Sequence, residues 1–131
     1  MKGLLLDTNV VIWVLGEERK ISRRAMGALS LPGVQLVVSV VSLWEILIKR
    51  QAGKLWTSEI PDHIVELITA SGAWRILPVE VAHLRSLSTL ESPVGHSDPF
   101  DRLLLAQARH EGLSVVTADS QFHRYDVDVI W

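Results

Sequence analysis

The chain has 131 residues, which suits one domain spanning residues 1–131, and 48% of them are hydrophobic, which excludes global disorder. The formal net charge is −2, so no overall basic field draws the chain to nucleic acid, and any such binding must use local patches. Because cysteine is absent, disulfides, thiolate zinc sites and cysteine nucleophiles are excluded, and the composition fits a reducing cytosol.

Short apolar segments alternate with helical patterns along the chain. Strands are predicted at residues 3–7, 34–40, 74–79, 113–119 and 127–131. Helices are predicted from residue 8 through Trp13, within 17–33, and over 42–54, 61–72, 79–91 and 100–112. Strands that alternate with helices predict an α/β fold, in which a mainly parallel sheet of four to five strands is covered on both faces.

The apolar start of the chain is interpreted as part of this fold and not as a targeting segment. Lys2 followed by apolar residues is a weak signal-peptide pattern, but Asp7 and Asn9 interrupt it and no small-residue cleavage site follows. The apolar stretches are also far shorter than the roughly 20 residues that a membrane-spanning helix needs.

Four acidic residues fall where the predicted elements meet one edge of the sheet. Asp7 ends the first predicted strand, and Asp119 ends the fourth. Glu45 lies one turn into a helix, and Asp101 lies at a helix N-terminus, at the head of an apolar stripe. In a parallel α/β sheet all these positions lie at the carboxyl edge, where such proteins bind ligands.

Several of these acids also have a structural explanation when each is considered alone. Asp7 and Asp119 could each cap the helix or turn that follows it. Asp98 could cap a helix whose first residue is Pro99, with Asp101 in its first turn near the positive end of the helix dipole. Capping alone, however, does not predict that acids dominate one edge of the sheet.

Glu45 has two structural explanations of its own. Ser42 and Glu45 fit a capping box, and Glu45 with Lys49 is a well-oriented i,i+4 ion pair, worth about 0.2–0.5 kcal/mol. The helix face favours a further role, because Glu45 interrupts a stripe formed with Val41 and Ile48. A carboxylate in such a stripe should be paired, bound to a metal or at the open end of the stripe.

Four carboxylates that converge at one edge predict a site for a divalent cation. Without the cation they would repel one another, and some would take up protons through raised pKa values. Oxygen ligands without cysteine favour Mg²⁺ or Mn²⁺ over zinc. One such ion, or two about 4 Å apart, can deprotonate a water and shield an in-line displacement at phosphorus, which indicates phosphodiester hydrolysis. Surface or turn positions are expected for the scattered histidines His83, His96, His110 and His123.

Four segments resemble the PIN-domain ribonucleases, and in particular the toxins of bacterial VapBC toxin–antitoxin pairs. They are LLLDTNVVIW at residues 4–13, VSLWEILIK at 41–49, HSDPFDRLLLAQA at 96–108 and LSVVTADSQF at 113–122. The resemblance covers nearly the whole chain in order. Its most specific element is HxDPFDR, with DTN before it and TxD after it.

This resemblance implies a PIN-like three-layer α/β/α sandwich and a cytoplasmic, metal-dependent endoribonuclease. The catalytic, metal-binding acids would be Asp7, Glu45, Asp101 and Asp119. Secondary positions would be Asn9, Asp98 and Thr117. Thr117 would support the last acid from outside the metal site. The resemblance further implies Mg²⁺ or Mn²⁺ as cofactor, RNA as substrate, a homodimer, and inhibition by an antitoxin protein that can place an arginine near the acids.

RNA that approaches an acidic pocket requires cations around it. The candidates for contact with phosphate are Lys49, Arg50 and Arg102. The remaining basic residues of the two charged segments, expected mostly on solvated helix faces, are Arg19, Lys20, Arg23, Arg24 and Lys54. Five tryptophans are expected mostly in the core, with one or two at a dimer or antitoxin interface. They are Trp13, Trp44, Trp56, Trp74 and Trp131.

Two other functions compete with the nuclease. A phosphoacceptor domain like the response-regulator receivers also gathers acids at a parallel sheet edge and binds Mg²⁺. That pattern requires adjacent acids after the first strand and a lysine after the fifth, whereas Asp7 stands alone and the last predicted strand is followed by no lysine. A PIN fold that serves only as a binding module is the third hypothesis, and the intact acids argue against it.

Overall fold

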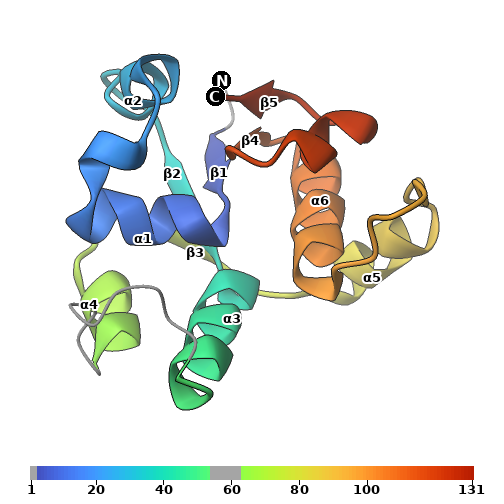
Figure 1. Ribbon diagram of the computed structural model, residues 1–131, viewed down its shortest axis with the longest axis horizontal. Helices are drawn as coiled ribbons and strands as arrows, with labels where there is room; N and C mark the ends of the chain where they lie inside the picture. The colour runs from blue at the N-terminus through green and yellow to red at the C-terminus, as the bar shows by residue number, and fades with distance from the viewer. Residues whose placement is uncertain (1–2, 54–62) are drawn as a thin grey trace.

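The computed structural model describes residues 3–53 and 63–131 and has a central sheet between layers of helices (Figure 1). The strands are β1 (Leu4–Leu6), β2 (Leu36–Ser39), β3 (Arg75–Leu77), β4 (Ser114–Val116) and β5 (Val129–Ile130). The α-helices are α1 (Thr8–Gly16), α2 (Arg23–Leu29), α3 (Val40–Gln51), α4 (Ile64–Ala70), α5 (Val81–Ser88) and α6 (Pro99–Glu111). Two short 3-10 helices are η1 (Glu18–Lys20) and η2 (Ser120–Arg124). None of the helices within the described ranges combines the length and the apolar character that crossing a bilayer requires.

The sheet has the order β3-β2-β1-β4-β5, and every neighbouring pair is parallel. β1 lies in the middle, and its Leu5 is in register with Val37 on one side and Val115 on the other. The chain adds β2 and β3 on one side of β1 and then crosses to β4 and β5. The strand order therefore reverses between β1 and β4, and at such a point α/β proteins bind ligands beyond the carboxyl ends of the strands. The predicted α/β fold with a parallel sheet is confirmed.

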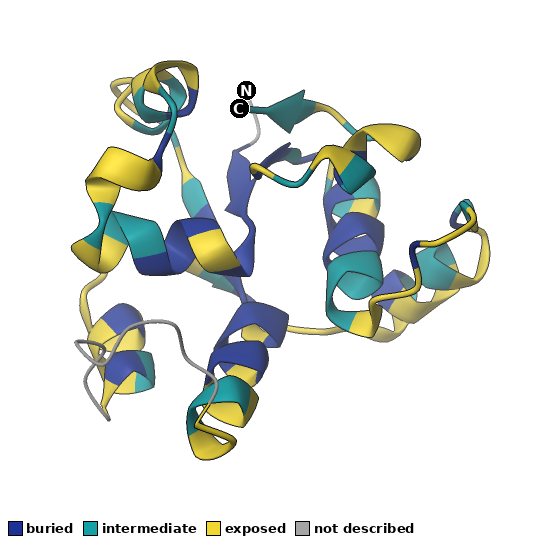
Figure 2. Cartoon of the chain, viewed as in Figure 1, coloured by how far each residue is buried: buried dark blue, intermediate teal, exposed yellow. Residues whose placement is uncertain are grey.

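Alternate residues of the central strand are buried on opposite faces of the sheet. Leu4 and Leu6 pack in a core with residues of α1, α2, α3 and α4. Leu5 packs in a second core with α6, including Leu104 and Leu105, and with part of α5. Figure 2 shows the buried residues concentrated on the central strands and on the helix turns that face them. Burial on both faces explains why these strands are continuous apolar runs, and it confirms the three-layer arrangement.

Helix α3 begins two residues earlier than the sequence predicts. The expected first residue was Ser42, whereas β2 ends at Ser39 and the helix starts at Val40. Ser39 is the cap, because its Oγ accepts a hydrogen bond from the backbone N–H of Val41 at 3.0 Å. The turn from strand to helix is thus immediate, and it keeps the first turns of α3 next to the carboxyl edge of the sheet.

Parts of the predictions fall on residues 1–2 and 54–62, outside the described residues. They concern Lys2, Lys54, Trp56 and the first residues of the helix predicted over 61–72, of which α4 is described from Ile64.

Candidate metal centre

Asp7 lies directly after β1, at the point where the strand order reverses. Its backbone N–H donates to the carbonyl of Val116 in β4 at 3.0 Å, so the residue is held between two strands. The side chain is 7% exposed and caps α1, because Oδ1 accepts from the backbone N–H of Thr8 at 2.7 Å. Asn9, in the first turn of α1, is exposed. The predicted cap is confirmed, and it uses only one of the two carboxylate oxygens of Asp7.

Thr117 connects the acids that follow β1 and β4. Its hydroxyl is buried, donates to Oδ2 of Asp7 at 2.8 Å, and accepts from the backbone N–H of Asp119 at 3.0 Å. Asp119 in turn caps η2, since its Oδ1 accepts from the backbone N–H of Gln121 at 2.9 Å. A single hydroxyl therefore fixes the spacing between the two acids across neighbouring strands.

Glu45 reaches the same edge from the second turn of α3. Its side chain is buried, and its Oε2 lies 2.7 Å from Nζ of Lys49, which confirms the predicted ion pair. The predicted capping box is wrong, because Ser42 lies inside the helix and its Oγ accepts a hydrogen bond from Oγ1 of Thr8 at 3.0 Å. This bond joins α3 to the first residue of α1 and brings Glu45 towards Asp7.

The N-terminus of α6 supplies the remaining predicted acid. Asp98 caps the helix, with Oδ1 accepting from the backbone N–H of Asp101 at 3.0 Å, and Pro99 is the first helical residue, as predicted. Asp98 is exposed, whereas Asp101 is half-buried and its Oδ2 lies 3.1 Å from Nε2 of His96. Polar atoms of His96, Asp101 and Asp119 all lie within 4.8 Å of one another.

Burial and repulsion from neighbouring carboxylates disfavour the charged forms of Asp7 and Asp101. Burial raises the pKa of Asp7 from 3.8 to about 7. The charges of Asp101 and Glu45 add to this increase, although the hydrogen bond from Thr117 opposes it. Burial likewise raises the pKa of Asp101 from 3.8 to about 6, and the charge of Asp119 contributes. The structure therefore brings the four predicted acids together closely enough for neighbouring charges to interact.

The donor set of this cluster suits a hard divalent cation. The acids offer carboxylate oxygens, which Mg²⁺ and Mn²⁺ prefer, and the chain has no thiolate to offer a softer metal. A positive ion among them would also remove the repulsion and the cost of burial that raise the pKa values of Asp7 and Asp101. The residues present thus fit the metal that the sequence predicts.

A second cluster, formed by Glu80, His83 and Glu111, lies at the other end of α6 and does not suit a metal. The backbone N–H of Glu80 donates to Nδ1 of His83 at 3.0 Å, so this nitrogen carries no proton in the neutral ring. Nε2 must then carry the proton, and it donates to Oε2 of Glu111 at 2.9 Å. Both ring nitrogens are used, and the cluster joins α5 to α6.

The expectation that the histidines occupy surface or turn positions is wrong for His83, which lies in α5, whereas His96 closes a turn with Pro93 but is buried. His83 is 0% exposed and His96 is 8% exposed, whereas His110 and His123 are exposed. His96 is the functional residue that sequence reasoning missed, because it contacts a predicted metal ligand. The available signal was its place at the head of the HSDPFDR element, five residues before Asp101.

The candidates for RNA contact differ in their surroundings. Arg102 is half-buried, and its Nη1 donates to the carbonyl of Glu91 at 2.7 Å and to the hydroxyl of Tyr125 at 3.1 Å. Lys49 pairs with the acid of α3, at the edge that gathers the acids. Contact with phosphate stays a prediction for Lys49, Arg50 and Arg102, and Arg102 also makes internal hydrogen bonds that the sequence did not indicate.

Among the tryptophans within residues 3–53 and 63–131, Trp44 departs most from the expected core position. It is 55% exposed on α3, and its ring meets Phe100 of α6 edge-on, with ring centroids 4.9 Å apart. Trp13, Trp74 and Trp131 are partly buried and pack against the core shared with α1 and α4. The apolar residues of α3 that are exposed are Val40, Trp44, Leu47 and Ile48.

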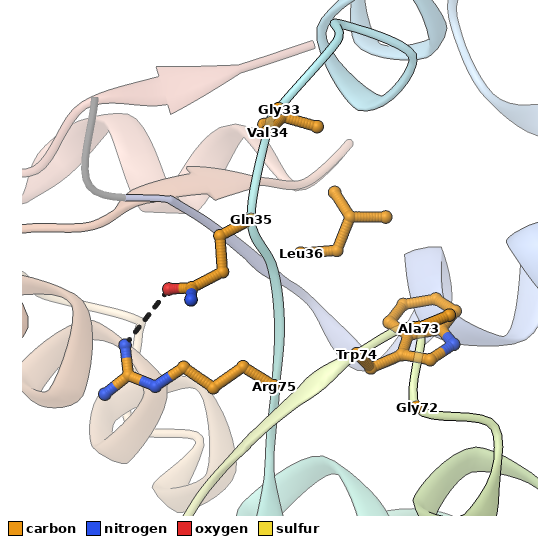
Figure 3. A pocket seen from close by; sticks show the side chains of 8 residues that line it. All are labelled: Gly33, Val34, Gln35, Leu36, Gly72, Ala73, Trp74 and Arg75. Atoms are coloured by element: carbon orange, nitrogen blue, oxygen red, sulfur yellow. Dashed lines mark hydrogen bonds between the residues drawn. The ribbon is translucent and has the colours of Figure 1, made fainter.

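A pocket of about 380 Å³ lies at the opposite, amino edge of the sheet (Figure 3). The segments that line it, residues 33–36 and 72–75, lead into β2 and β3. Arg75 lines it and donates to Oε1 of Gln35 at 3.4 Å, and it also pairs with Glu111 at 3.5 Å. This pocket is remote from the acids, and its arginine is already paired.

Comparison with known proteins relates the chain to one family and one fold. The family model described as "PIN domain" matches residues 4–128. No curated protein gives a significant sequence match. Among solved structures, VapBC2 of Rickettsia felis bound to a DNA fragment from its promoter is similar, with a TM-score of 0.70, 16% identity and 96% of each chain covered.

Two further structures are similar over nearly the same length. DNA-bound VapBC of Salmonella typhimurium has a TM-score of 0.70 and 19% identity, covering 98% of this chain and 97% of that one. FitAcB of Neisseria gonorrhoeae has a TM-score of 0.62 and 22% identity, covering 96% and 95%. At these identities the likeness concerns the fold.

Proposed function

The chain belongs to the PIN-domain family, and from that membership we propose that it is a metal-dependent endoribonuclease, the toxin of a type II toxin–antitoxin pair. The proposed reaction is hydrolysis of RNA phosphodiester bonds by water, with Mg²⁺ or Mn²⁺ as cofactor. The proposed compartment is the cytoplasm, where RNA is available.

One observation supports this proposal above the others. Four acids from separate parts of the chain gather at the switch point of the sheet, two that follow β1 and β4 and two from α3 and α6: Asp7, Asp119, Glu45 and Asp101. When bound there, a divalent cation lowers the pKa of a water molecule and shields the negative charge of the phosphodiester. A purely structural function would not require Asp7 and Asp101 to lie where burial disfavours their charge.

The contacts of these residues indicate a function for each of them in the proposed site. Asp7 and Asp101 give up their protons and bind the cation as anions. Thr117 holds Asp7 and Asp119 at a fixed spacing through its single hydroxyl. Lys49, which pairs with Glu45, supplies a positive charge at the rim of the acids that attracts the phosphate backbone.

The proposed partners are a cognate antitoxin and a second copy of this chain. The similar structures from Rickettsia felis and Salmonella typhimurium are described as VapBC bound to DNA, and one from Klebsiella pneumoniae as a toxin–antitoxin complex. The exposed apolar face of α3, with Trp44 at its centre, has the residue type that anchors protein interfaces. We propose that a partner protein covers it.

A receiver-like phosphoacceptor function is disfavoured by the topology. Receivers have the strand order 2-1-3-4-5, whereas this sheet has the order β3-β2-β1-β4-β5. In addition, the side chain of Asp7 already accepts hydrogen bonds on both oxygens, from Thr8 and from Thr117. These contacts suit a fixed ligand better than a nucleophile that must attack phosphorus.

Incubation of the purified, antitoxin-free protein with total RNA tests the proposal. With Mn²⁺ or Mg²⁺ we expect discrete RNA fragments, and with a chelator we expect the RNA to stay intact, because the carboxylates need the cation. Fragments in equal amount with the chelator would contradict metal dependence. Intact RNA under all conditions, together with a stable acyl-phosphate after treatment with a small phosphodonor, would favour the receiver instead.

A further inference from the structure

Three buried or half-buried side chains form a line of hydrogen bonds that ends on Asp101. Arg102 is anchored first, because its Nη1 donates to the carbonyl of Glu91 at 2.7 Å and to the hydroxyl oxygen of Tyr125 at 3.1 Å. The same hydroxyl lies 2.6 Å from Nδ1 of His96. Nε2 of that ring lies 3.1 Å from Oδ2 of Asp101. The line therefore connects two neighbouring residues of α6 through the C-terminal segment and the loop before the helix.

The donors and acceptors of this line determine where its protons lie. Arginine only donates, so the oxygen of Tyr125 accepts from Arg102. The hydroxyl proton of Tyr125 then points to Nδ1 of His96, which accepts it. A neutral ring that accepts at Nδ1 carries its proton on Nε2 and donates to Oδ2 of Asp101. With a neutral ring, this arrangement gives each hydrogen bond of the line one donor and one acceptor.

The surroundings of His96 keep the ring in one orientation. The ring is 8% exposed and packs edge-on against Tyr125, with centroids 5.4 Å apart, and obliquely against Phe122, with centroids 6.3 Å apart. Tyr125 is 5% exposed, and the guanidinium of Arg102 lies 5.9 Å from its ring centroid. A donor fixed in this way restricts rotation of the carboxylate that accepts from it.

We propose that His96, with its proton held on Nε2 by Tyr125 and Arg102, is a positioning residue that orients the carboxylate of Asp101 for the divalent cation. This inference rests on the proposed function, since it assigns a supporting partner to one of the proposed metal ligands. His96 itself is not a ligand in this account, because its Nε2 carries the proton. Partners of this kind typically contribute about 10- to 100-fold to metal affinity or activity.

His83 provides a matched control within the same helix pair. It is also a buried histidine that accepts at Nδ1 and donates from Nε2 to a carboxylate of α6. Its acceptor, Glu111, lies at the opposite end of α6, remote from the acids. His83→Gln therefore makes the same change as His96→Gln in a buried histidine–carboxylate bond, without disturbing Asp101.

The first test reads the tautomer of His96 directly. Nitrogen-15 NMR of the metal-free protein, with assignment from the spectrum of the His96→Gln variant, identifies the protonated ring nitrogen. We expect the proton on Nε2 in the wild type and a larger share on Nδ1 in Tyr125→Phe, which keeps the ring but removes the hydroxyl. A proton on Nδ1 in the wild type would overturn the proposal.

The second test measures Mn²⁺ affinity by calorimetry for His96→Leu, His96→Gln, Tyr125→Phe and His83→Gln. We expect a roughly 10- to 100-fold loss for His96→Leu, a smaller loss for Tyr125→Phe, and partial recovery in His96→Gln, whose amide can still donate to Asp101. His83→Gln should bind Mn²⁺ as the wild type does. Circular dichroism confirms which variants are folded, and Tyr125→Phe keeps the test valid if His96→Leu does not fold.

The outcomes separate this inference from the proposed function. If folded His96→Leu binds Mn²⁺ with wild-type affinity, or if His83→Gln loses as much Mn²⁺ affinity as His96→Gln, the positioning function of His96 is overturned. The proposed nuclease function is unaffected by either result. Failure of the wild type to bind Mn²⁺ and to cleave RNA would remove the proposed function, and the inference with it.

Discussion

Replacement of Asp101 by asparagine is expected to lower RNA cleavage by at least about 100-fold, the loss typical when one electrostatic element of an active site is removed. The change removes one negative charge from the cluster and keeps the shape of the side chain. The helix cap is unaffected, because Asp98 accepts from the backbone N–H of residue 101. His96 can still donate to the amide oxygen of the new side chain. Initial rates with a labelled RNA fragment in Mn²⁺ measure the effect.

Asp128→Asn is the control for this loss of charge. Asp128 is exposed, precedes β5 at the amino edge of the sheet, and accepts from the hydroxyl of Ser114 at 2.7 Å. We expect Asp128→Asn to cleave at the wild-type rate. A folded Asp101→Asn variant that cleaves as fast as this control would contradict the assignment of Asp101 to the site.

Replacement of Asp7 by asparagine is expected to stabilise the metal-free protein at pH 8. Asparagine can keep the bond from Thr8 and offer its amide to the hydroxyl of Thr117. Burial raises the pKa of Asp7 to about 7, above its value near 3.9 in the unfolded chain. The folded state therefore binds the proton more tightly, and stability falls as pH rises from about 4 to about 7.

The asparagine variant lacks the ionisable carboxyl and therefore does not lose this stability as pH rises. The amount by which its free energy of unfolding exceeds that of the wild type should therefore grow with pH. Between pH 5 and pH 8 we expect the difference in the free energy of unfolding to grow by about 2–3 kcal/mol. Urea denaturation at the two pH values, with a chelator present, measures the growth. Mn²⁺ should then stabilise the wild type and have little effect on Asp7→Asn.

Asp128→Asn again serves as the control, because its carboxylate is exposed. The difference in the free energy of unfolding between Asp128→Asn and the wild type should be about the same at pH 5 and at pH 8. If the difference for Asp7→Asn is also the same at the two pH values, the carboxylate of Asp7 is not buried beside other negative charges as described above.

Much of the fold could be predicted because its strands are simple apolar runs. In a parallel sheet covered on both faces, Leu4, Leu5 and Leu6 are all buried, and no alternation is needed to recognise the strand. Glycine also ends α6 as expected, since Gly112 adopts a φ of 70° at the helix end, which other residues rarely adopt. Local signals of these kinds do not depend on distant partners.

The start of α3 could not be predicted because two serines compete for the same function. Ser39 and Ser42 both suit a helix cap, and Ser42 is followed three residues later by Glu45, as in a capping box. The structure uses Ser39, and Ser42 instead accepts from the hydroxyl of Thr8, 34 residues away. Only the folded arrangement of α1 and α3 decides between the two serines.

The acids of the site could be predicted, whereas the groups that hold them could not. Asp7 and Asp119 follow the strands β1 and β4, and that position alone brings them to one edge. Tyr125 contacts His96 across 29 residues, and nothing in the local pattern around either residue indicates the pair. The same is true of Arg102, whose hydrogen bond to Tyr125 has no counterpart in the local sequence pattern.

The central claim is that acids distant along the chain gather around one divalent cation, and crystals grown with Mn²⁺ test it most directly. The account predicts an anomalous diffraction peak among the carboxylates of Asp7, Asp101 and Asp119, close to Glu45. No peak among those acids, or a peak found instead at His83 and Glu111, would contradict it.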